Sequence, residues 1–281
     1  MSLSHDFAPQ FALPRAEQSR SARVLGKLSR FAARIIAVKT VRLTNQRPLV
    51  SFTFDDAPVS ACTIGAALLE EYKARGTYYV CGAGCGSEGF CGRLAAVADL
   101  KTLAVTGHEI GCHTYSHVAA ARVGRQKLTA DLARNGAFLG GVQRAATFYN
   151  FAYPYGEFSL ATKLYLQRQF DSCRSLIPGV NIGSADLGAL KSCELQNASI
   201  DRRGVAAIIA ATVRHNGWLI FTSHDVAAEP SRFGVSPDLL AFALATARDA
   251  GCHLTSVRDA LSILRGRVAY PGSEELGQGI D

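Results

Sequence analysis

The sequence has no hydrophobic run that approaches about 18 consecutive apolar residues, the length that a membrane-spanning helix needs. The start of the chain also has no apolar run of about 7–15 residues after a basic segment, which is the pattern of a secretory signal. We therefore expect no transmembrane span, and a cytoplasmic location by default.

A glycine-rich phosphate-binding loop is missing as well. Residues 82–92 are rich in glycine, but no helical pattern opens directly on a GxGxxG or GxxxxGK sequence. The formal charge of +7 is unevenly spread, because residues 1–50 hold nine Lys or Arg against two Asp or Glu, and residues 51–281 are neutral. A neutral body without a phosphate loop favours neither a nucleotide cofactor nor a nucleic-acid partner.

The eight cysteines are an even number, which alone proves little. In a cytosolic protein of this size, most cysteines are expected to be reduced, buried and small hydrophobic residues. Cys81, Cys85 and Cys91 are close in sequence, but their spacing fits no common zinc pattern. We interpret them as ordinary loop cysteines and not as a second metal cluster.

Residues 20–39 have the pattern of a basic amphipathic helix. Its apolar residues recur at three- and four-residue spacing, and most of its basic residues fall on the other side. We expect the apolar side to pack on the body of the protein or on a second subunit, as in a homodimer, with the arginines in solvent. Contact with an anionic membrane surface is the alternative. The apolar positions are Leu25, Leu28, Phe31, Ala32, Ile35 and Ile36.

From residue 49 onward, short apolar runs alternate with helical patterns. This alternation predicts an α/β fold with a parallel sheet, either open or closed into a barrel. The predicted strands are 49–54, 77–80, 109–112, 147–151, 171–175, 218–222 and 253–256, and the predicted helices are 60–74, 93–106, 125–140, 159–169, 202–216 and 236–249.

Unusual polar residues follow several of these strands. Asp55 and Asp56 end the first strand, and His113, Tyr155 and His224 follow later ones. In parallel α/β folds, reactive groups gather at the carboxyl ends of the strands. These side chains are therefore expected to meet at one face.

Two of these motifs suggest a metal site. Adjacent carboxylates such as Asp55 and Asp56 repel each other unless a cation compensates them, although an Asp-Asp turn that caps a helix is the commoner explanation of such a pair alone. His113 and His117 have the four-residue spacing that places two imidazoles on one side of a helical turn, where they can hold zinc. Cys112 is expected in the core, and His108 as a structural hydrogen-bonding residue.

Four motifs occur together in a fixed order: Thr53-Phe54-Asp55-Asp56, His113-Thr114-Tyr115-Ser116-His117, Phe151-Ala152-Tyr153-Pro154-Tyr155-Gly156 and Trp218-Leu219-Ile220-Phe221-Thr222-Ser223-His224. In this combination the sequence resembles the polysaccharide deacetylase family, also called the NodB homology family or carbohydrate esterase family 4. The resemblance implies a distorted (β/α) barrel of about seven parallel strands. It also implies a division into a basic arm and amphipathic helix (1–47), a catalytic domain (48–265) and a tail (266–281).

The resemblance further implies one divalent metal ion bound by Asp56, His113 and His117. Zinc is the expected ion, and cobalt or another divalent ion is the alternative.

The resemblance also implies the catalytic roles. Asp55 corresponds to the base that deprotonates a metal-activated water, and His224 to the acid that protonates the leaving amine. The backbone N–H of Tyr155 corresponds to an oxyanion donor, and Pro154 and Tyr155 to residues that contact the substrate.

The sequence departs from the family pattern in places. Ala152 stands where the family usually has an arginine that orients the base, and Arg174 is a candidate substitute. Ala57 replaces a common glycine. An aspartate often supports the acid histidine in the family, and Asp171 and Asp186 are both candidates for this role.

The implied activity is a metal-dependent hydrolase that removes an N-acyl group, with acetyl expected, from an amino sugar of a polysaccharide, oligosaccharide or glycolipid. A sugar deformylase or a hydrolase of small cyclic imides or ureides is the first alternative. A catalytically weak carbohydrate-binding relative, suggested mainly by Ala152, is the second.

Overall fold

The structure, a computed structural model, describes residues 20–143 and 150–266, with side chains from Gly26 onward except that of Lys27. The predicted N-terminal arm up to residue 19, the tail from residue 267 and the first residues of the strand predicted at 147–151 lie outside this description.

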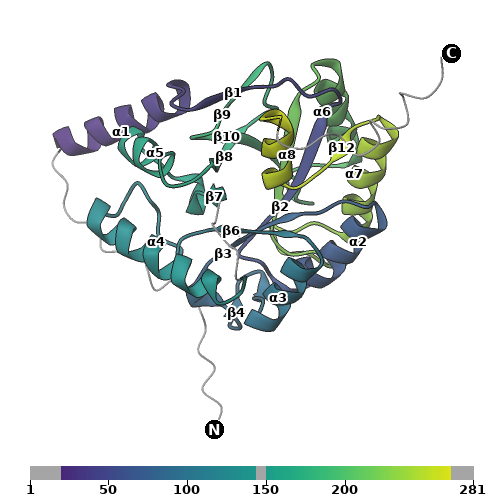
Figure 1. Ribbon diagram of the computed structural model, residues 1–281, viewed down its shortest axis with the longest axis horizontal. Coiled ribbons are helices and arrows are strands. Elements are labelled where there is room, and N and C mark those ends of the chain that lie inside the picture. Colours follow the sequence, from purple (N-terminus) through teal and green to yellow (C-terminus); the bar gives the residue numbers. More distant parts are fainter. Residues whose placement is uncertain (1–19, 144–149, 267–281) are drawn as a thin grey trace, which may run out of the picture.

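Seven parallel strands form a closed barrel. Neighbouring strands pair in the order β2-β3-β6-β7-β8-β10-β11, and β11 pairs back onto β2 over six residues to close the circle. The predicted barrel of about seven strands is therefore confirmed (Figure 1). The strands are β2 (Leu49–Asp55), β3 (Thr77–Val80), β6 (Glu109–Cys112), β7 (Asn150–Ala152), β8 (Ser172–Pro178), β10 (Leu190–Glu194) and β11 (Trp218–Ser223).

Helices surround the barrel, and capping residues in the sequence fix where several of them begin (Figure 1). Ser236 accepts a hydrogen bond from the N–H of Leu239 at the start of α7, and Pro237 occupies the first turn of that helix. No helix within the described residues is long and apolar enough to cross a membrane. Around the barrel lie η1 (Ala61–Gly65), α2 (Ala66–Glu71), α3 (Val97–Val105), α4 (Arg125–Gly140), α5 (Leu160–Leu166), α6 (Arg202–Arg214), α7 (Pro237–Asp249) and α8 (Val257–Leu264).

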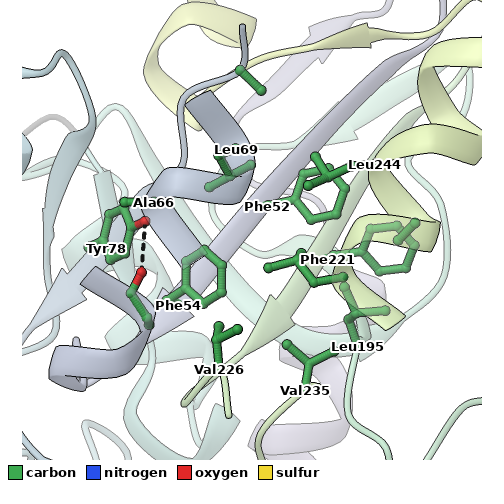
Figure 2. Packing of buried hydrophobic residues seen from close by; sticks show 14 of the residues in the cluster. Phe52, Phe54, Ala66, Leu69, Tyr78, Leu195, Phe221, Val226, Val235 and Leu244 are labelled. Atoms are coloured by element: carbon green, nitrogen blue, oxygen red, sulfur yellow. Dashed lines mark hydrogen bonds between the residues drawn. The ribbon is translucent and has the colours of Figure 1, made fainter. Parts of the chain in front are cut away.

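Successive side chains of β2 point alternately to the core under the helices and to the interior of the barrel. Phe52 and Phe54 point toward the helices, where they pack in one cluster with Phe221 of β11 and Leu244 of α7 (Figure 2). Asp55 has the opposite parity, so its side chain belongs to the interior face of the barrel. All residues of β2 are buried, and the two polar residues that interrupt its apolar run, Ser51 and Thr53, lie on the same side of the strand as Asp55.

Two small antiparallel sheets of two strands each lie outside the barrel sheet. β1 (Thr40–Arg42) pairs with β9 (Ser184–Asp186), and β4 (Glu88–Gly89) pairs with β5 (Gly92–Arg93) in the loop after η2 (Gly82–Gly84). β12 (His253–Leu254) pairs only with Leu49 and Val50 at the start of β2, so this strand is an addition to the barrel and not one of its seven strands.

The sequence patterns missed β10 and α8. β10 is short and mixes exposed Lys191 and Glu194 with buried residues, so it lacks an apolar run. The predicted set of seven strands therefore included 253–256, which corresponds to β12, and omitted β10. α8 did carry a recognisable signal, because Ser256 caps the helix by accepting from the N–H of Asp259.

Helix α1 (Arg20–Ile35) ends four residues before the predicted boundary and packs beside α5 (Figure 1). It approaches the body through small residues, and Ala33 is fully buried. Leu28, Phe31 and Ile35 are 58%, 65% and 64% exposed. These side chains therefore do not pack on the body, because the small-residue side of the helix faces α5. Their packing on a second subunit, the other half of the prediction, stays a prediction.

Candidate metal and catalytic site

Polar residues at the carboxyl ends of the barrel strands come together at one rim, as the sequence predicted. Each comes from a different position in the chain, and the closed parallel barrel brings the strand ends to the same side. The residues are Asp55 and Asp56 at the end of β2, Cys81 after β3, His113 and His117 after β6, Tyr155 in η3 (Pro154–Gly156) after β7, Arg174 on β8 and His224 after β11.

Four possible metal-ligand atoms lie within 4.8 Å of one another, one each from Asp56, Cys81, His113 and His117. Asp56 Oδ1 is 3.7 Å from His117 Nε2 and 3.6 Å from Cys81 Sγ. The three residues expected from the motifs are therefore adjacent. Cys81 is an addition that the sequence interpretation missed, although its position directly after a strand was the same signal that singled out the others.

A hydrogen bond to the backbone orients His113. Its Nδ1 lies 2.8 Å from the carbonyl oxygen of Ala152, so Nδ1–H donates and Nε2 is left for the ligand cluster. Burial lowers the pKa of His113 to about 4. The imidazole is therefore neutral at neutral pH, which is the form that binds a metal ion.

The segment from His113 to His117 is not helical, contrary to the spacing argument. It is a bend in which Asp131 accepts hydrogen bonds from the N–H groups of Tyr115 and Ser116 at 2.6 and 3.2 Å. The bend brings the two imidazole rings to 5.0 Å between centroids. The pairing of the histidines was predicted correctly, and the local conformation was not.

Left-handed backbone conformations are concentrated at this rim. Five of the seven non-glycine residues with positive φ in the described chain lie here. Such conformations cost about 1–3 kcal/mol each and persist where the surrounding structure enforces them, often at functional sites. The five residues are Asp56 (φ 61°), Ala57 (50°), Thr114 (63°), His117 (51°) and Tyr155 (59°).

Arg174 holds Asp55 in a buried ion pair. Its Nη2 lies 2.5 Å from both carboxylate oxygens, and both side chains are almost inaccessible to solvent. Burial alone raises the pKa of Asp55, but the charge of Arg174 and its hydrogen bonds to the carboxylate outweigh burial and lower the pKa below its ordinary value. Asp55 is therefore a carboxylate at neutral pH.

The register of the sheet explains why Arg174 reaches this position. Ala152 on β7 pairs directly with Arg174 on β8. The guanidinium that the family pattern places at Ala152 is thus supplied from the neighbouring strand. Arg174 is the cation beside Asp55, as the sequence suggested.

His224 lies between aromatic rings at the end of β11. Its ring centroid is 5.4 Å from that of Phe233 and 6.4 Å from that of Phe90. Its Nδ1 is buried and has no hydrogen-bond partner among the described residues.

Neither aspartate predicted to support His224 does so in the described structure. Asp171 pairs with Arg265 at 3.1 Å, and Asp186 pairs with Lys163 at 2.5 Å. Asp171 precedes β8 and so lies at the amino end of that strand, whereas His224 follows the carboxyl end of β11. The topology of the barrel therefore separates these two residues.

Tyr155 forms the exposed edge of the site. Its side chain is 57% exposed, and its ring centroid lies 4.5 Å from that of His117. Pro154, which precedes it, is buried. Residues Tyr155–Phe158 also line a pocket of about 330 Å³ together with Arg30, Phe31 and Arg34 of α1.

The fold and the rim define a closed (β/α) barrel with a candidate metal centre at the carboxyl ends of its strands. Residues 42–170 match the family model for polysaccharide deacetylase. The family resemblance drawn from the motifs is therefore confirmed over residues 42–170. None of the curated proteins compared with the chain matches it.

Solved structures share the fold at low sequence identity. The Bc1960 peptidoglycan N-acetylglucosamine deacetylase is 15% identical, with a TM-score of 0.58 over 83% of this chain and 96% of that one. PdaA of Bacillus subtilis, a family 4 carbohydrate esterase, is 14% identical, with a TM-score of 0.53 over 84% and 88%. A family 4 pseudoenzyme from Bacillus anthracis is 11% identical, with a TM-score of 0.55 over 77% and 66%.

The buried ion pair leads to a prediction about stability. Arg174→Met should lower the free energy of unfolding by about 3–5 kcal/mol, because it leaves a buried carboxylate without its partner. Urea unfolding with a chelator present measures this loss. The double variant Asp55→Asn/Arg174→Met is the control and should recover part of it, since neither charge remains.

The loss of unfolding free energy in Arg174→Met should depend on pH. The folded-state pKa of Asp55 lies below its unfolded value, so the ionic stabilisation is complete above the unfolded pKa and is lost as pH falls through the folded one. The difference in the free energy of unfolding between the wild type and Arg174→Met should therefore become smaller as the pH falls. A difference that stays constant from neutral pH to pH of about 3 would contradict the ion pair as its source.

Proposed function

We propose that the chain is a metal-dependent N-deacetylase that acts on an amino sugar. One observation carries this proposal: the buried Asp55–Arg174 pair lies beside the ligand cluster of Asp56, His113 and His117. A carboxylate that stays ionised next to a metal site is what general-base hydrolysis of an amide requires.

The donor set fits a divalent ion. Two imidazoles and a carboxylate form a set that zinc accepts with positions left open, and the bond from His113 Nδ1 to Ala152 already fixes one ring. A bound ion supplies Lewis acidity, which polarises the amide carbonyl and lowers the pKa of a bound water. Zinc suits this nitrogen-rich set, and cobalt is the practical substitute.

Asp55 acts as the general base in this proposal. Its carboxylate accepts the proton of the attacking water, and Arg174 keeps it ionised and oriented. The substitution of Ala152 for the usual arginine was the main reason to consider an inactive relative. Arg174 removes that reason, because a guanidinium still contacts the base.

His224 acts as the general acid. Amide hydrolysis needs a proton for the leaving nitrogen, because an amine anion is a poor leaving group. The charge of His224 helps to lower the pKa of Asp55, so the two residues are electrostatically coupled across the site. The N–H of Tyr155 is proposed to stabilise the oxyanion, and Tyr155 with Pro154 is proposed to contact the sugar.

The activity and its base are tested together. With added zinc or cobalt, the purified chain should release acetate from N-acetylated amino sugars, and a chelator should abolish the release. Asp55→Asn should lower kcat by about 10²–10⁴-fold, the usual cost of losing a general base, while the bound metal remains. His113→Ala should lose both the metal and the activity. Elemental analysis and an acetate assay measure the two effects.

Several outcomes would change this assignment. Release of formate in place of acetate would indicate a deformylase, and turnover of cyclic imides alone would indicate a non-sugar amidase. Loss of metal in Asp55→Asn would make Asp55 a ligand and would refute the proposed division of roles.

The proton donor has its own test. His224→Ala should strongly lower kcat on amides but have a smaller effect on activated esters, whose leaving groups depart without a proton. Comparison of kcat for an N-acetyl substrate and an aryl acetate measures the difference. Equal losses on both substrates would show that His224 positions the substrate and does not donate the proton.

A further inference from the structure

Cys81 stands apart from the other cysteines of the described chain. It directly follows β3, it is 7% exposed, and its Sγ is the only thiol sulfur in the described cluster of ligand atoms. Cys85, four residues later, points elsewhere, since its thiol donates to the carbonyl oxygen of Ala95 at 3.0 Å. Cys112 at the end of β6 is turned toward Asn135, whose Nδ2 lies 3.2 Å from its sulfur.

The position of the Cys81 thiol is fixed from two sides. Its Sγ lies 3.0 Å from the carbonyl oxygen of His113 and 3.6 Å from Asp56 Oδ1. The first contact is with a backbone oxygen and holds the thiol in place, and Sγ lies within 4.8 Å of the candidate ligand atoms of Asp56, His113 and His117. The next residue, Gly82, is held by Asn135, whose Oδ1 accepts from its N–H at 3.0 Å.

We propose that Cys81 is a fourth protein ligand, which makes the centre an Asp-Cys-His-His site. The activated water would then take a fifth position, as catalytic zinc sites can expand to five ligands. This inference rests on the proposed function, because it concerns the same ion. When the ion binds, the thiol proton is released to solvent and the sulfur coordinates as a thiolate. A thiolate is a soft ligand, so the site should select zinc or cobalt over magnesium and manganese.

Cobalt spectroscopy tests this ligand without measuring activity. The full chain titrated with Co²⁺ should show the ultraviolet charge-transfer absorption of a cobalt–thiolate bond. Cys81→Ser should lose that band, while the matched control Cys85→Ser, from the same loop, should keep it. The dissociation constant for cobalt should rise by about 100-fold or more in Cys81→Ser, since even the loss of an outer partner costs about 10–100-fold.

The results separate this inference from the proposed function. Stoichiometric cobalt without the charge-transfer band would overturn ligation by Cys81 and leave the metal centre standing. Persistence of the band in Cys81→Ser would also overturn it. Failure of the wild type to bind cobalt would refute the metal centre itself, and the inference with it. Should Cys81→Ser fail to fold, Cys81→Ala gives the same comparison.

Helix α1 carries a second, independent observation. Leu28, Phe31 and Ile35 recur on one side of the helix and are all more than half exposed. The helix cannot turn to bury them, because Lys163 Nζ donates to the carbonyl oxygens of Ala33 and Ile36, both at 2.7 Å. The large apolar side chains of α1 are thus held outward.

The charge of α1 favours one kind of partner. The helix contains five Lys or Arg and no acidic residue. Arg30 and Arg34 are exposed, and neither forms a salt bridge within the described residues. A second copy of the chain on this face would bring like charges together, whereas an anionic lipid surface complements both the charge and the apolar side chains.

The location of α1 connects this surface with the candidate site. Arg30, Phe31 and Arg34 line the same pocket as Tyr155, whose ring contacts that of His117. We infer that α1 docks on an anionic membrane surface, with the rim of the barrel beside the lipid. The substrate class that fits this placement is an acylated amino sugar carried on a lipid.

Vesicle flotation tests the docking with the full chain. The wild type should float with vesicles that contain phosphatidylglycerol and not with phosphatidylcholine alone. Arg30→Gln and Arg34→Gln should each weaken partitioning by about 5-fold. The triple variant Leu28→Ser/Phe31→Ser/Ile35→Ser should not float, and Val105→Ser, an exposed apolar residue on α3, is the matched control.

Two results would overturn the lipid assignment. One is failure of the wild type to float with anionic vesicles at physiological salt. The other is a dimer in solution that the triple variant abolishes, because the apolar face would then be covered by a second copy. Either result leaves the acetate-release and cobalt experiments unaffected, so failure here is separate from failure of the proposed function.

Discussion

Closure of the barrel between β2 and β11 is the constraint on which the candidate site depends. The two strands pair in parallel from Leu49–Trp218 to Phe54–Ser223. This pairing brings His224, which follows β11, to the same rim as Asp55 at the end of β2, although about 170 residues separate them in sequence. In an open sheet of the same seven strands, β2 and β11 would be the opposite edges, and Asp55 and His224 would lie far apart.

The two ends of the barrel serve different purposes. At the amino end, the buried carboxylate of Glu109 accepts hydrogen bonds from Thr77, Asn150 and the N–H of Arg258, so it ties β3, β7 and α8 together. All three of these hydrogen bonds to the Glu109 carboxylate come from groups of the protein itself. At the carboxyl end, the backbone is left-handed at several positions, and the buried Nδ1 of His224 lacks a partner in the described structure. Most of the left-handed residues of the described chain, five of seven, therefore lie at the end of the barrel that carries the candidate site.

The sequence predicted those features that depend on strand ends and failed on those that depend on packing and register. Asp55, Asp56, His113 and His224 each follow an apolar strand, so their convergence was foreseeable from topology alone. β10 was missed because its exposed Lys191 and Glu194 interrupt the apolar pattern. Cys81 was missed because it was interpreted together with Cys85 and Cys91 as an ordinary loop cysteine, and only the fold places it beside Asp56, His113 and His117. The exposed face of α1 could not be foreseen, since the pattern shows which residues are apolar but not which side of the helix meets α5.

Arg174 illustrates how neighbouring strands of a barrel can present a guanidinium to the same carboxylate. Asp55 needs a positive charge within hydrogen-bonding distance to stay ionised while buried, and the identity of the strand that supplies it is secondary. β7 and β8 are adjacent and in register at Ala152 and Arg174, so moving the guanidinium across one strand still places it on the interior face. Its Nε and Nη1 have no hydrogen-bond partner in the described structure, so Asp55 is the one carboxylate that compensates its charge. An arginine shared among several acceptors would lower the pKa of Asp55 less, and this carboxylate would be protonated over a wider range of pH.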